Sequence, residues 1–450
     1  MSSSPLHTPL PNPPSSLLEP VPFGRPMRDT HFLLHPSYNP LNHGAYGTYP
    51  RYVQHHLHHY QLLAESRPDA FTNFLYPPLL NESRSAIADF FGVALEEIVF
   101  VPNATNATTV VLSNLVYEPK DCILHLSTVY GAVEKLVEYL KETRSGLSNI
   151  NVPVEYPCGD DELVQKVRTA MQKAKADGLK VRVAVFDNIS SMPALRQPWE
   201  RLVQLCKEEG VFSLIDAAHG AGQTELSIKA ADPDFLVTNL HKWLFVPRPV
   251  AAFYVPLRNQ HLIRTAIPTS HGFRPLPPPE VNPSKTPIFN PLPASQQSPF
   301  VSLFEFVAKY ALLIPTPPPT QQNLHVDILD NPSGESSDRN GGRTCAITQV
   351  SLPLSIVPDD HPAASPSDPA VVRHADIKKT IDWLQHRLLE EYDTYAPFFF
   401  HAGKLWVRFS GMIYCEVGDY ERGIRGIVEL VVRVRRGELE GVGKGKGARL

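Results

Sequence analysis

The sequence lacks several features that define whole classes of protein. No apolar run approaches the ~18 residues of a membrane-spanning helix, and the N-terminus has neither the basic nor the apolar region of a signal peptide. The five cysteines form no Cys-x-x-Cys pair, which is typical of a reducing compartment. Lysine and arginine (42) do not exceed aspartate and glutamate (46), so no charge surplus favours nucleic acid. We therefore expect a cytoplasmic protein with neither a membrane nor a nucleic-acid partner.

Glycine is sparse, and the 25 glycines form neither a collagen repeat nor the glycine-rich loop of a dinucleotide or P-loop site. Proline is abundant instead, and 27 of its 45 residues lie in the three stretches 1–26, 275–332 and 353–369. Because proline interrupts helices and central strands, these stretches divide the chain. The predicted organisation is a Pro-rich tail (1–26), a large domain (27–306), an insertion or linker (307–343), a small domain (344–436) and a basic, glycine-rich tail (437–450).

Short apolar runs alternate with helical patterns through the predicted large domain. Strand-like runs lie at 98–101, 123–126, 181–186, 211–215, 235–237 and 250–255, and helical patterns at 84–91, 109–116, 131–141, 161–176 and 199–209. This alternation predicts an α/β fold with a mainly parallel sheet, whose ligands bind at the carboxyl ends of the strands. Beyond residue 344, strand patterns at 345–354 and 405–409 and helical patterns at 374–391 and 419–435 predict a smaller α+β unit.

Residues with useful chemistry follow these strands. Asp216 ends one strand, Lys242 follows another, and residues 103–105 open a helix. Each has an ordinary alternative, such as a helix cap for the aspartate or a surface position for the lysine. Together they are the minimum set for pyridoxal 5'-phosphate (PLP): a Schiff-base lysine, a carboxylate for the pyridine nitrogen and main-chain N–H groups for the phosphate. The order of the three on one α/β chain predicts a PLP site.

Five segments resemble the class V aminotransferase family of fold-type I PLP enzymes, which includes isopenicillin N epimerase-like proteins and cysteine desulfurases. These segments are 41–47, 101–105, 216–219, 239–243 and 406–410. The stretches 187–198, 233–255 and 268–272 resemble the fungal branch typified by hercynylcysteine sulfoxide lyase of ergothioneine biosynthesis. The resemblance implies a PLP-dependent transferase fold with a mainly parallel seven-stranded sheet and a smaller C-terminal domain. It also implies a homodimer that acts on a small amino-acid substrate.

The resemblance assigns a role to each matching residue. Lys242 would be the Schiff-base lysine and, with Tyr130, the catalytic group, while Arg408 would bind the substrate carboxylate as a two-pronged fork. The segment ahead of the large domain would contribute to the small domain and to the substrate mouth through Asn42 and His43. Cofactor contacts would come from Ala104, Thr105, Tyr130, Asn188, Asp216, His219, His241 and Lys242.

The reaction that this resemblance implies is removal of the α-proton followed by β-elimination, as in a carbon–sulfur lyase acting on hercynylcysteine sulfoxide. An epimerase, a cysteine desulfurase-like enzyme and a class V aminotransferase stay open as alternatives. Relatives carry a Gly-Thr-x-Asp turn after residue 306 that reaches the partner's phosphate, and this chain has the Pro- and Ser-rich segment 307–343 there. Divergence and an imperfect gene model both explain this segment, and an inactive PLP-fold protein is a further alternative.

The histidine-rich stretch 55–59 has metal-ligand spacing on a helix, but no acidic or cysteine residue accompanies it. We therefore expect no metal site.

Overall fold

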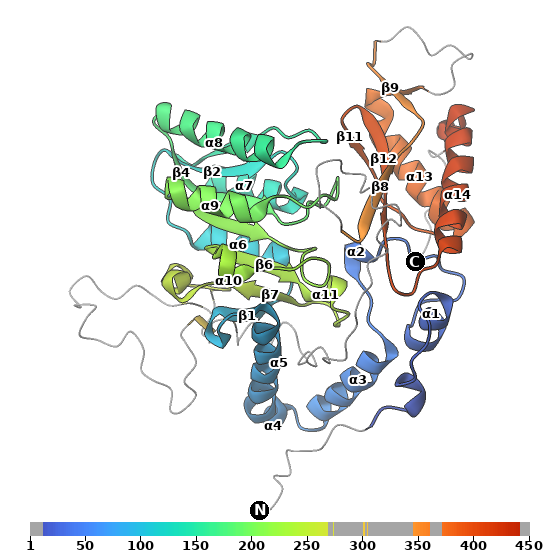
Figure 1. Cartoon of the computed structure of the whole chain (residues 1–450), viewed down its shortest axis with the longest axis horizontal. Helices are drawn as coiled ribbons and strands as arrows, with labels where there is room; N and C mark the ends of the chain where they lie inside the picture. Colours follow the sequence, from blue (N-terminus) through green and yellow to red (C-terminus); the bar gives the residue numbers. More distant parts are fainter. Residues whose placement is uncertain are drawn as a thin grey trace, which may run out of the picture.

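The computed structural model describes residues 12–268, 273, 300–301, 304, 345–360 and 371–441. The predicted linker at 307–343 and the end of the C-terminal tail lie outside the described residues. Figure 1 shows the seven-stranded sheet with its helices on one side of the molecule and the small domain on the other.

The large domain is built on one seven-stranded sheet. Its strands are β1 (Ile98–Val101), β2 (Asp121–Leu126), β3 (Ser148–Val152), β4 (Lys180–Asp187), β5 (Phe212–Asp216), β6 (Phe235–Asn239) and β7 (Ala251–Tyr254). Their order is β1-β7-β6-β5-β4-β2-β3, and only β7 runs antiparallel to its neighbours. The predicted mainly parallel, seven-stranded sheet is confirmed.

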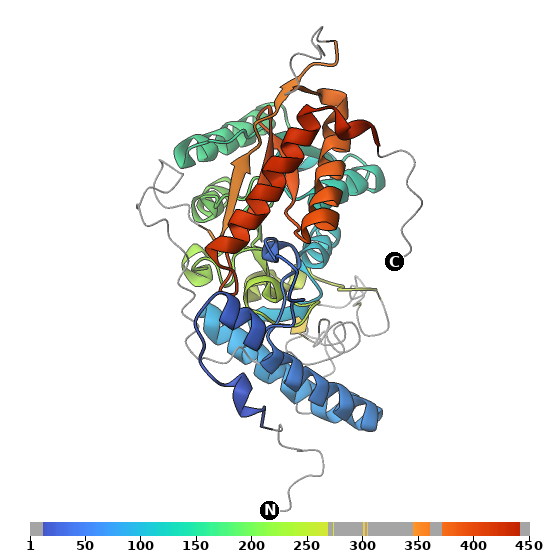
Figure 2. The same ribbon diagram turned by 90° about the vertical axis from the view of Figure 1, so that its right-hand side faces the viewer.

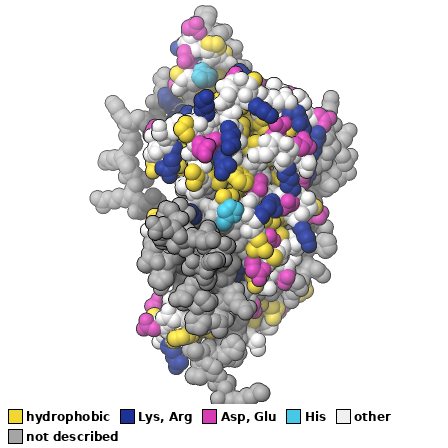
Figure 3. Space-filling view, turned by 90° about the vertical axis from the view of Figure 1, so that its left-hand side faces the viewer, with side chains coloured by type: hydrophobic (Ala, Val, Ile, Leu, Met, Phe, Trp, Pro, Cys, Tyr) yellow, Lys and Arg dark blue, Asp and Glu magenta, His cyan; other side chains and the backbone are white. Residues whose placement is uncertain are grey.

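Helices cover both faces of this sheet. They are α5 (Tyr76–Phe91), α6 (Ala104–Asn114), α7 (Gly131–Thr143), α8 (Asp160–Ala176) and α9 (Trp199–Glu209). One core holds apolar residues of α5, α8 and α9, and a second core on the other face holds those of α6 and α7. Figure 3, which views the α8 and α9 side, shows acidic and basic side chains interspersed, in keeping with ion pairs such as Arg168–Glu208 between these helices.

The small domain has an antiparallel sheet ordered β11-β12-β8, made of β8 (Ile347–Ser351), β11 (Phe398–His401) and β12 (Lys404–Ser410). Helices α13 (Ile377–Tyr392) and α14 (Val417–Arg435) lie side by side against it (Figure 2). A short parallel pair, β9 (Ser355–Val357) and β10 (Val371–Arg373), extends the domain. A third core of aliphatic and aromatic residues holds these elements together.

The N-terminal helices are α1 (Arg25–His31), α2 (His43–Tyr46) and α3 (Arg51–Ser66). The segment around α1 and α2 packs on the small domain: the buried Arg28 and Asp419 form an ion pair, and the Ser410 N–H donates to the carbonyl of Leu41 at 2.8 Å. Leu41 itself belongs to the small-domain core. The chain therefore reaches the small domain first and only then enters the large one.

Candidate active site

The carboxyl ends of β4, β5 and β6 bring the predicted residues together. Asp187 ends β4 and Asp216 ends β5, and these two residues are opposite each other in the parallel ladder. Strand β6 ends at Asn239 and continues directly into the short helix α11 (Leu240–Trp243), which carries Lys242. The crossover topology therefore places three polar clusters, far apart in sequence, at one edge of the sheet.

Lys242 is half-buried, and its Nζ lies 3.4 Å from Nε2 of His219. Burial lowers the pKa of Lys242 to about 8; the charge of Asp216 acts in the opposite direction and that of Arg408 in the same direction. At neutral pH this amine is uncharged far more often than an exposed lysine. An uncharged amine is the form that attacks a carbonyl carbon or removes a proton.

Two buried carboxyl groups, those of Asp187 and Asp216, lie side by side at the ends of β4 and β5. Asp216 accepts a hydrogen bond at Oδ1 from the Ala218 N–H at 3.0 Å. Burial raises the pKa of Asp216, while this N–H and the charge of Lys242 act against the rise. Asp187 has an oxygen without a partner, and burial together with the charge of Asp216 holds its pKa well above the usual range. Asp216 is therefore the carboxyl group better suited to face a cation.

His219 is buried, and the Trp243 Nε1–H donates to its Nδ1 at 3.4 Å. An accepting Nδ1 leaves the ring proton on Nε2, the atom nearest Lys242. Burial, then the charge of Lys242, lowers the pKa of His219 well below its ordinary value. The ring is thus neutral and fixed in direction.

The start of α6 is joined to the strand that leads to Lys242. Asn103 caps the helix by accepting from the Asn106 N–H at 2.9 Å. The Ala104 N–H donates to Oδ1 of Asn239 at 3.0 Å, so this predicted phosphate donor already has a partner. Thr105 is exposed at the same helix start. An anion at this end would meet the positive end of the helix dipole.

Arg408 lies on β12 and is only 4% exposed. Its Nη1 donates to the Ser191 carbonyl at 2.7 Å and its Nη2 to Oδ1 of Asn42 at 3.1 Å, while Nε has no partner. Within the described part of the chain no carboxylate pairs with it, and burial lowers its pKa to about 10. A buried guanidinium without a counter-ion is a strong binding site for a carboxylate. Tyr130, at the start of α7 and 46% exposed, interacts electrostatically with it.

Three other predicted site residues, Asn188, His241 and His43, make main-chain contacts that the sequence did not predict. Asn188 donates its N–H to the Asp216 carbonyl at 2.9 Å, and its buried Nδ2 has no partner. The His241 Nδ1 lies 2.7 Å from the Val250 carbonyl, and burial lowers the pKa of His241 to about 4. His43 is buried, and its Nε2 contacts the main-chain carbonyl of Lys242.

Sequence reasoning named neither Asn239 nor Trp243 as a site residue, although both belong to the segment around Lys242. Their nearness in sequence was the signal that could have found them. Tyr414, which hydrogen-bonds His43, gave no such signal, because it is one aromatic residue in a loop after β12.

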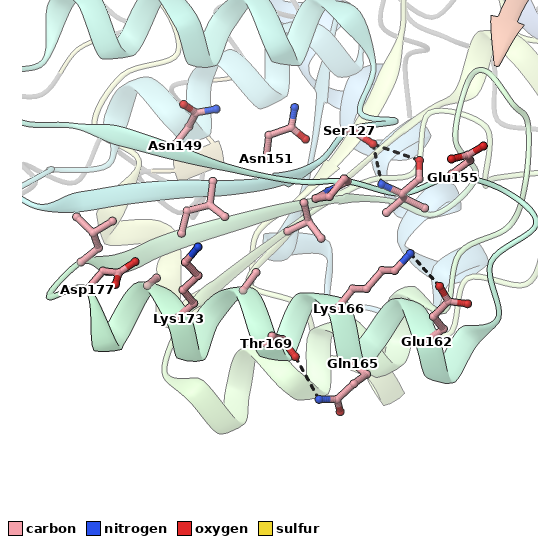
Figure 4. Close-up of a pocket in the computed structure, with 17 residues that line it drawn as sticks. Ser127, Asn149, Asn151, Glu155, Glu162, Gln165, Lys166, Thr169, Lys173 and Asp177 are labelled. Carbon is pink, nitrogen blue, oxygen red and sulfur yellow. Dashed lines mark hydrogen bonds and ion pairs between the residues drawn. The ribbon is translucent and has the colours of Figure 1, made fainter. Parts of the chain in front are cut away.

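A cavity of about 990 Å³ lies elsewhere, between the edge strand β3 and helix α8 (Figure 4). Aliphatic residues of β3 and α8 line it, and the polar residues at its rim include Lys166, which is paired with Glu162 at 2.8 Å. None of the predicted site residues lines this cavity. We therefore assign the chemistry to the strand ends and not to this hollow.

The histidines of the stretch 55–59 lie on α3. Among the residues that the structure describes, no group of three or more histidine, cysteine, aspartate or glutamate side chains is arranged to hold a metal. Over the same residues, no helix is both long enough and apolar enough to cross a bilayer.

The residues at the strand ends fit PLP. The unpaired polar atoms of Asp187, Asn188 and Arg408 are buried where a polar ligand would satisfy them. The exposed start of α6 suits a phosphate, and Lys242 has the lowered pKa that a covalent link to an aldehyde requires. The class of protein that this fold and site define is a fold-type I PLP enzyme.

Comparison with known proteins agrees. Residues 77–268 match the family model described as aminotransferase class-V. An L-cysteine desulfhydrase-like protein, lolT1 of Epichloe uncinata, is 33% identical over 89% of this chain and 94% of its own length. Hercynylcysteine sulfoxide lyase of Schizosaccharomyces pombe is 30% identical over 88% and 95%.

Among solved structures, a complex of the cystine C–S lyase C-DES with cysteine persulfide has a TM-score of 0.56 and 16% identity, covering 89% of this chain and 98% of that one. This likeness shows the fold. The protein belongs to the class V aminotransferase family, and its cofactor is PLP. Carbon–sulfur bond cleavage is the class of reaction that its relatives support.

Proposed function

We propose that this protein is a PLP-dependent carbon–sulfur lyase that cleaves a cysteine-conjugate sulfoxide, hercynylcysteine sulfoxide, in ergothioneine biosynthesis. The observation that carries the proposal is the pairing of Lys242, whose pKa is lowered to about 8, with a buried Arg408 that lacks a counter-ion. Lys242 would remove the proton from the substrate Cα, and Arg408 would bind the substrate carboxylate next to that carbon. The similarity to hercynylcysteine sulfoxide lyase over 88% of the chain supports the substrate.

The cofactor would be held by residues at or just after the ends of β4 and β5, by residues of the helices α6 and α11, and by Tyr130 at the start of α7. Lys242 would bond its aldehyde carbon, Asp216 would face the pyridine nitrogen, and His219 and Tyr130 would lie beside the ring. Asn188 would donate its free Nδ2–H to the hydroxyl oxygen that the pyridine ring carries. Ala104, Thr105 and His241 would surround the phosphate. PLP bound in this way supplies an electron sink that stabilises negative charge at the substrate Cα.

The chain's own residues then direct the elimination. Arg408 and Asn42 orient the substrate carboxylate, so that the Cα–H bond points at Lys242. The Lys242 Nζ takes the Cα proton, and the Cβ–S bond breaks with its electron pair leaving on sulfur as a sulfenate. The remaining 2-aminoacrylate hydrolyses to pyruvate and ammonia, so atoms and electrons balance without an added oxidant.

The direct test incubates the purified, PLP-loaded protein with hercynylcysteine sulfoxide and measures pyruvate. We expect stoichiometric pyruvate from the wild type and none from Lys242→Ala, with the cofactor absorbance of the wild type as the check on loading. A fully loaded protein that releases no pyruvate from this or any other cysteine-conjugate sulfoxide overturns the proposal.

L-cysteine desulfhydration is the second candidate, because the lolT1 protein is described as L-cysteine desulfhydrase-like and is 33% identical to this chain. That reaction uses the same proton transfer, but it releases sulfide together with pyruvate. Sulfide production from L-cysteine at a higher kcat/KM than pyruvate production from the sulfoxide would favour it.

The other class V reactions have less support from the site. A cysteine desulfurase needs a reactive thiol, and burial raises the pKa of Cys345, the cysteine near Arg408, to about 11. An aminotransferase would consume a 2-oxo acid, and an epimerase would exchange the Cα proton with solvent without releasing pyruvate. Analysis of the same assay mixtures for enzyme-bound sulfur, 2-oxo acid consumption and Cα proton exchange distinguishes the desulfurase, the aminotransferase and the epimerase.

We also propose a cytoplasmic homodimer. All five cysteines are free, in keeping with a reducing compartment. Sedimentation of the purified protein at twice the monomer mass would support the dimer, and a monomer that keeps full activity would overturn it.

A further inference from the structure

His43 lies against the main chain of Lys242. It is 5% exposed, and Nε2 contacts the main-chain carbonyl of Lys242. Its Nδ1 lies 2.6 Å from the hydroxyl of Tyr414, which is also buried. A short chain of hydrogen bonds therefore runs from the loop after β12 in the small domain to the backbone of the lysine.

The direction of this chain is fixed by chemistry. A carbonyl oxygen only accepts, so Nε2 carries the proton and donates to Lys242. The neutral ring then accepts at Nδ1 from the Tyr414 hydroxyl. Burial lowers the pKa of His43 to about 4 and raises that of Tyr414 well above its ordinary value, so both groups keep these protonation states near neutral pH.

Aromatic side chains hold the histidine ring in place. The ring centroids of Trp243, Phe245 and Tyr414 lie 5.2, 5.5 and 5.7 Å from that of His43. Phe245 adopts a φ of 57°, a left-handed conformation that is costly for a bulky residue. Trp243 and Phe245, which follow Lys242 in the chain, thus pack against His43, and the backbone of Phe245 is strained.

The backbone on either side of this contact is also fixed. Helices α2 and α11 lie next to each other (Figure 1). Arg248 donates to the carbonyls of Tyr46 and Gly47 at 3.0 and 2.6 Å. A Cβ atom at Gly47 would lie 1.8 Å from the carbonyl oxygen of His241. The two segments are therefore in direct contact over several residues, of which His43 is the first.

We propose that His43 is a positioning residue, which holds the main chain of Lys242 in place and links it through Tyr414 to the small domain. The inference rests on the proposed role of Lys242, but it is independent of the substrate. It also differs from a role for His43 at the substrate mouth, because neither ring nitrogen is left to bind a substrate.

The test uses the PLP-loaded, full-length protein with three variants. His43→Phe keeps an aromatic ring but removes both hydrogen bonds, His43→Gln keeps a donor near Nε2, and Tyr414→Phe removes only the outer bond. His386→Gln, an exposed position on α13, is the control. The main readout is the pH midpoint at which the absorbance of the bound cofactor changes, and a second readout is the Kd of the apo-protein for PLP.

We expect His43→Phe to move the pH midpoint by about half a unit or more and to weaken PLP binding by about tenfold, the effect of losing one well-placed hydrogen bond. His43→Gln should restore most of the wild-type pH midpoint and PLP affinity. Tyr414→Phe should lie between the wild type and His43→Phe in both quantities, and His386→Gln should match the wild type. In the lyase assay, kcat should fall more than KM rises.

A purely structural role for His43 would lower the unfolding temperature and leave the pH midpoint of the folded fraction unchanged, and that outcome overturns the proposal. Failure of His43→Gln to restore either value does so too. If His43→Phe does not fold, the midpoint of Tyr414→Phe decides in its place. The pH midpoint, the Kd for PLP and the unfolding temperature need no lyase substrate, so these three readouts stand apart from the test of the proposed reaction.

Discussion

At the scale of single residues, the site is defined by ionisable groups that are buried without a full set of partners. Arg408 has no carboxylate partner among the described residues, Asp187 has an unpaired oxygen, and Lys242 is desolvated beside His219. Each of these is costly in the absence of a ligand. Their coincidence at one edge of the sheet is what distinguishes a ligand site from ordinary polar loops.

Arg408→Lys should keep the positive charge and lose the planar guanidinium group that donates several hydrogen bonds at once. Lysine is a point charge that cannot donate to a carboxylate and to Asn42 and Ser191 at once. We expect KM for the sulfoxide substrate to rise about tenfold or more with a smaller loss of kcat. Steady-state pyruvate formation measures this, with the cofactor absorbance as the loading control. An unchanged KM would show that another residue binds the carboxylate.

Asp187→Asn should make the apo-protein less sensitive to high pH. The pKa of Asp187 is raised, so the folded protein keeps a proton that the unfolded chain loses above about pH 4. The stability that depends on this proton is complete below pH 4 and is lost as pH rises toward the folded-state pKa. We expect Asp187→Asn to be more stable than wild type by about 1 kcal/mol at pH 8 and to lose this advantage near pH 4. Thermal unfolding across pH measures it, and parallel curves for the two proteins would contradict it.

At the scale of elements, local sequence signals place most helices and strands of the large domain. Helix α9 matches the predicted 199–209, and α8 begins one residue before the predicted 161–176, because their apolar faces repeat at helical spacing. Strand β3 was not predicted. Only Ile150 and Val152 are apolar in it, and pairing with β2 at the sheet edge makes it a strand.

The short helix α2 was also beyond local signals. Helix α2 has four residues, and its conformation depends on contacts with α11 and with Ser410, whose hydroxyl accepts from the Gly44 N–H at 3.1 Å. No period can be measured over four residues. Helix α6 begins at Ala104 with Asn103 as its cap, as predicted from residues 103–105, while the apolar pattern at 109–116 marks only the later part of the helix.

Gly47→Ala should test the contact between α2 and α11. Gly47 has a φ of 67°, and an added Cβ would overlap the His241 carbonyl. We expect a loss of unfolding free energy above about 2 kcal/mol together with weaker PLP binding. Gly92→Ala is the matched control, because Gly92 has a φ of 65° and open space around it, and it should cost about 1 kcal/mol with PLP binding intact. Equal effects of the two substitutions would contradict a specific role for the contact.

At the scale of the whole molecule, three polar links join the small domain to the large one near the site. Besides Arg408, the Ala346 N–H donates to Oε1 of Gln223 and the Ala194 N–H to Oε1 of Gln349, both at 2.8 Å. A mixed apolar cluster contains Phe32, Trp243, Ile347 and Tyr414, so it includes residues of the N-terminal segment and both domains. Movement of the small domain would therefore shift the residues that pack next to Lys242.

Arg28→Ala should loosen the N-terminal segment from the small domain. It leaves Asp419 buried, with the partly exposed Arg422 as its remaining ion-pair partner. We expect a loss of about 3 kcal/mol in unfolding free energy and a weaker hold on His43 through the same segment. Arg25→Ala, which breaks an exposed pair with Asp29, should cost less than about 1 kcal/mol. Chemical denaturation measures both, and similar losses would show that the buried pair does not anchor the segment.

The sequence by itself determined the class of fold, the order of its strands and helices, and the residue types that a PLP site needs. These follow from hydrophobic period and from motifs such as the one around Lys242, which are local properties of the chain. Only the tertiary structure decided which carboxyl group keeps its proton, that Arg408 is buried with no carboxylate partner among the described residues, and that His43 contacts the main chain of Lys242. Those properties depend on burial and on contacts between residues hundreds of positions apart, and no local pattern encodes them.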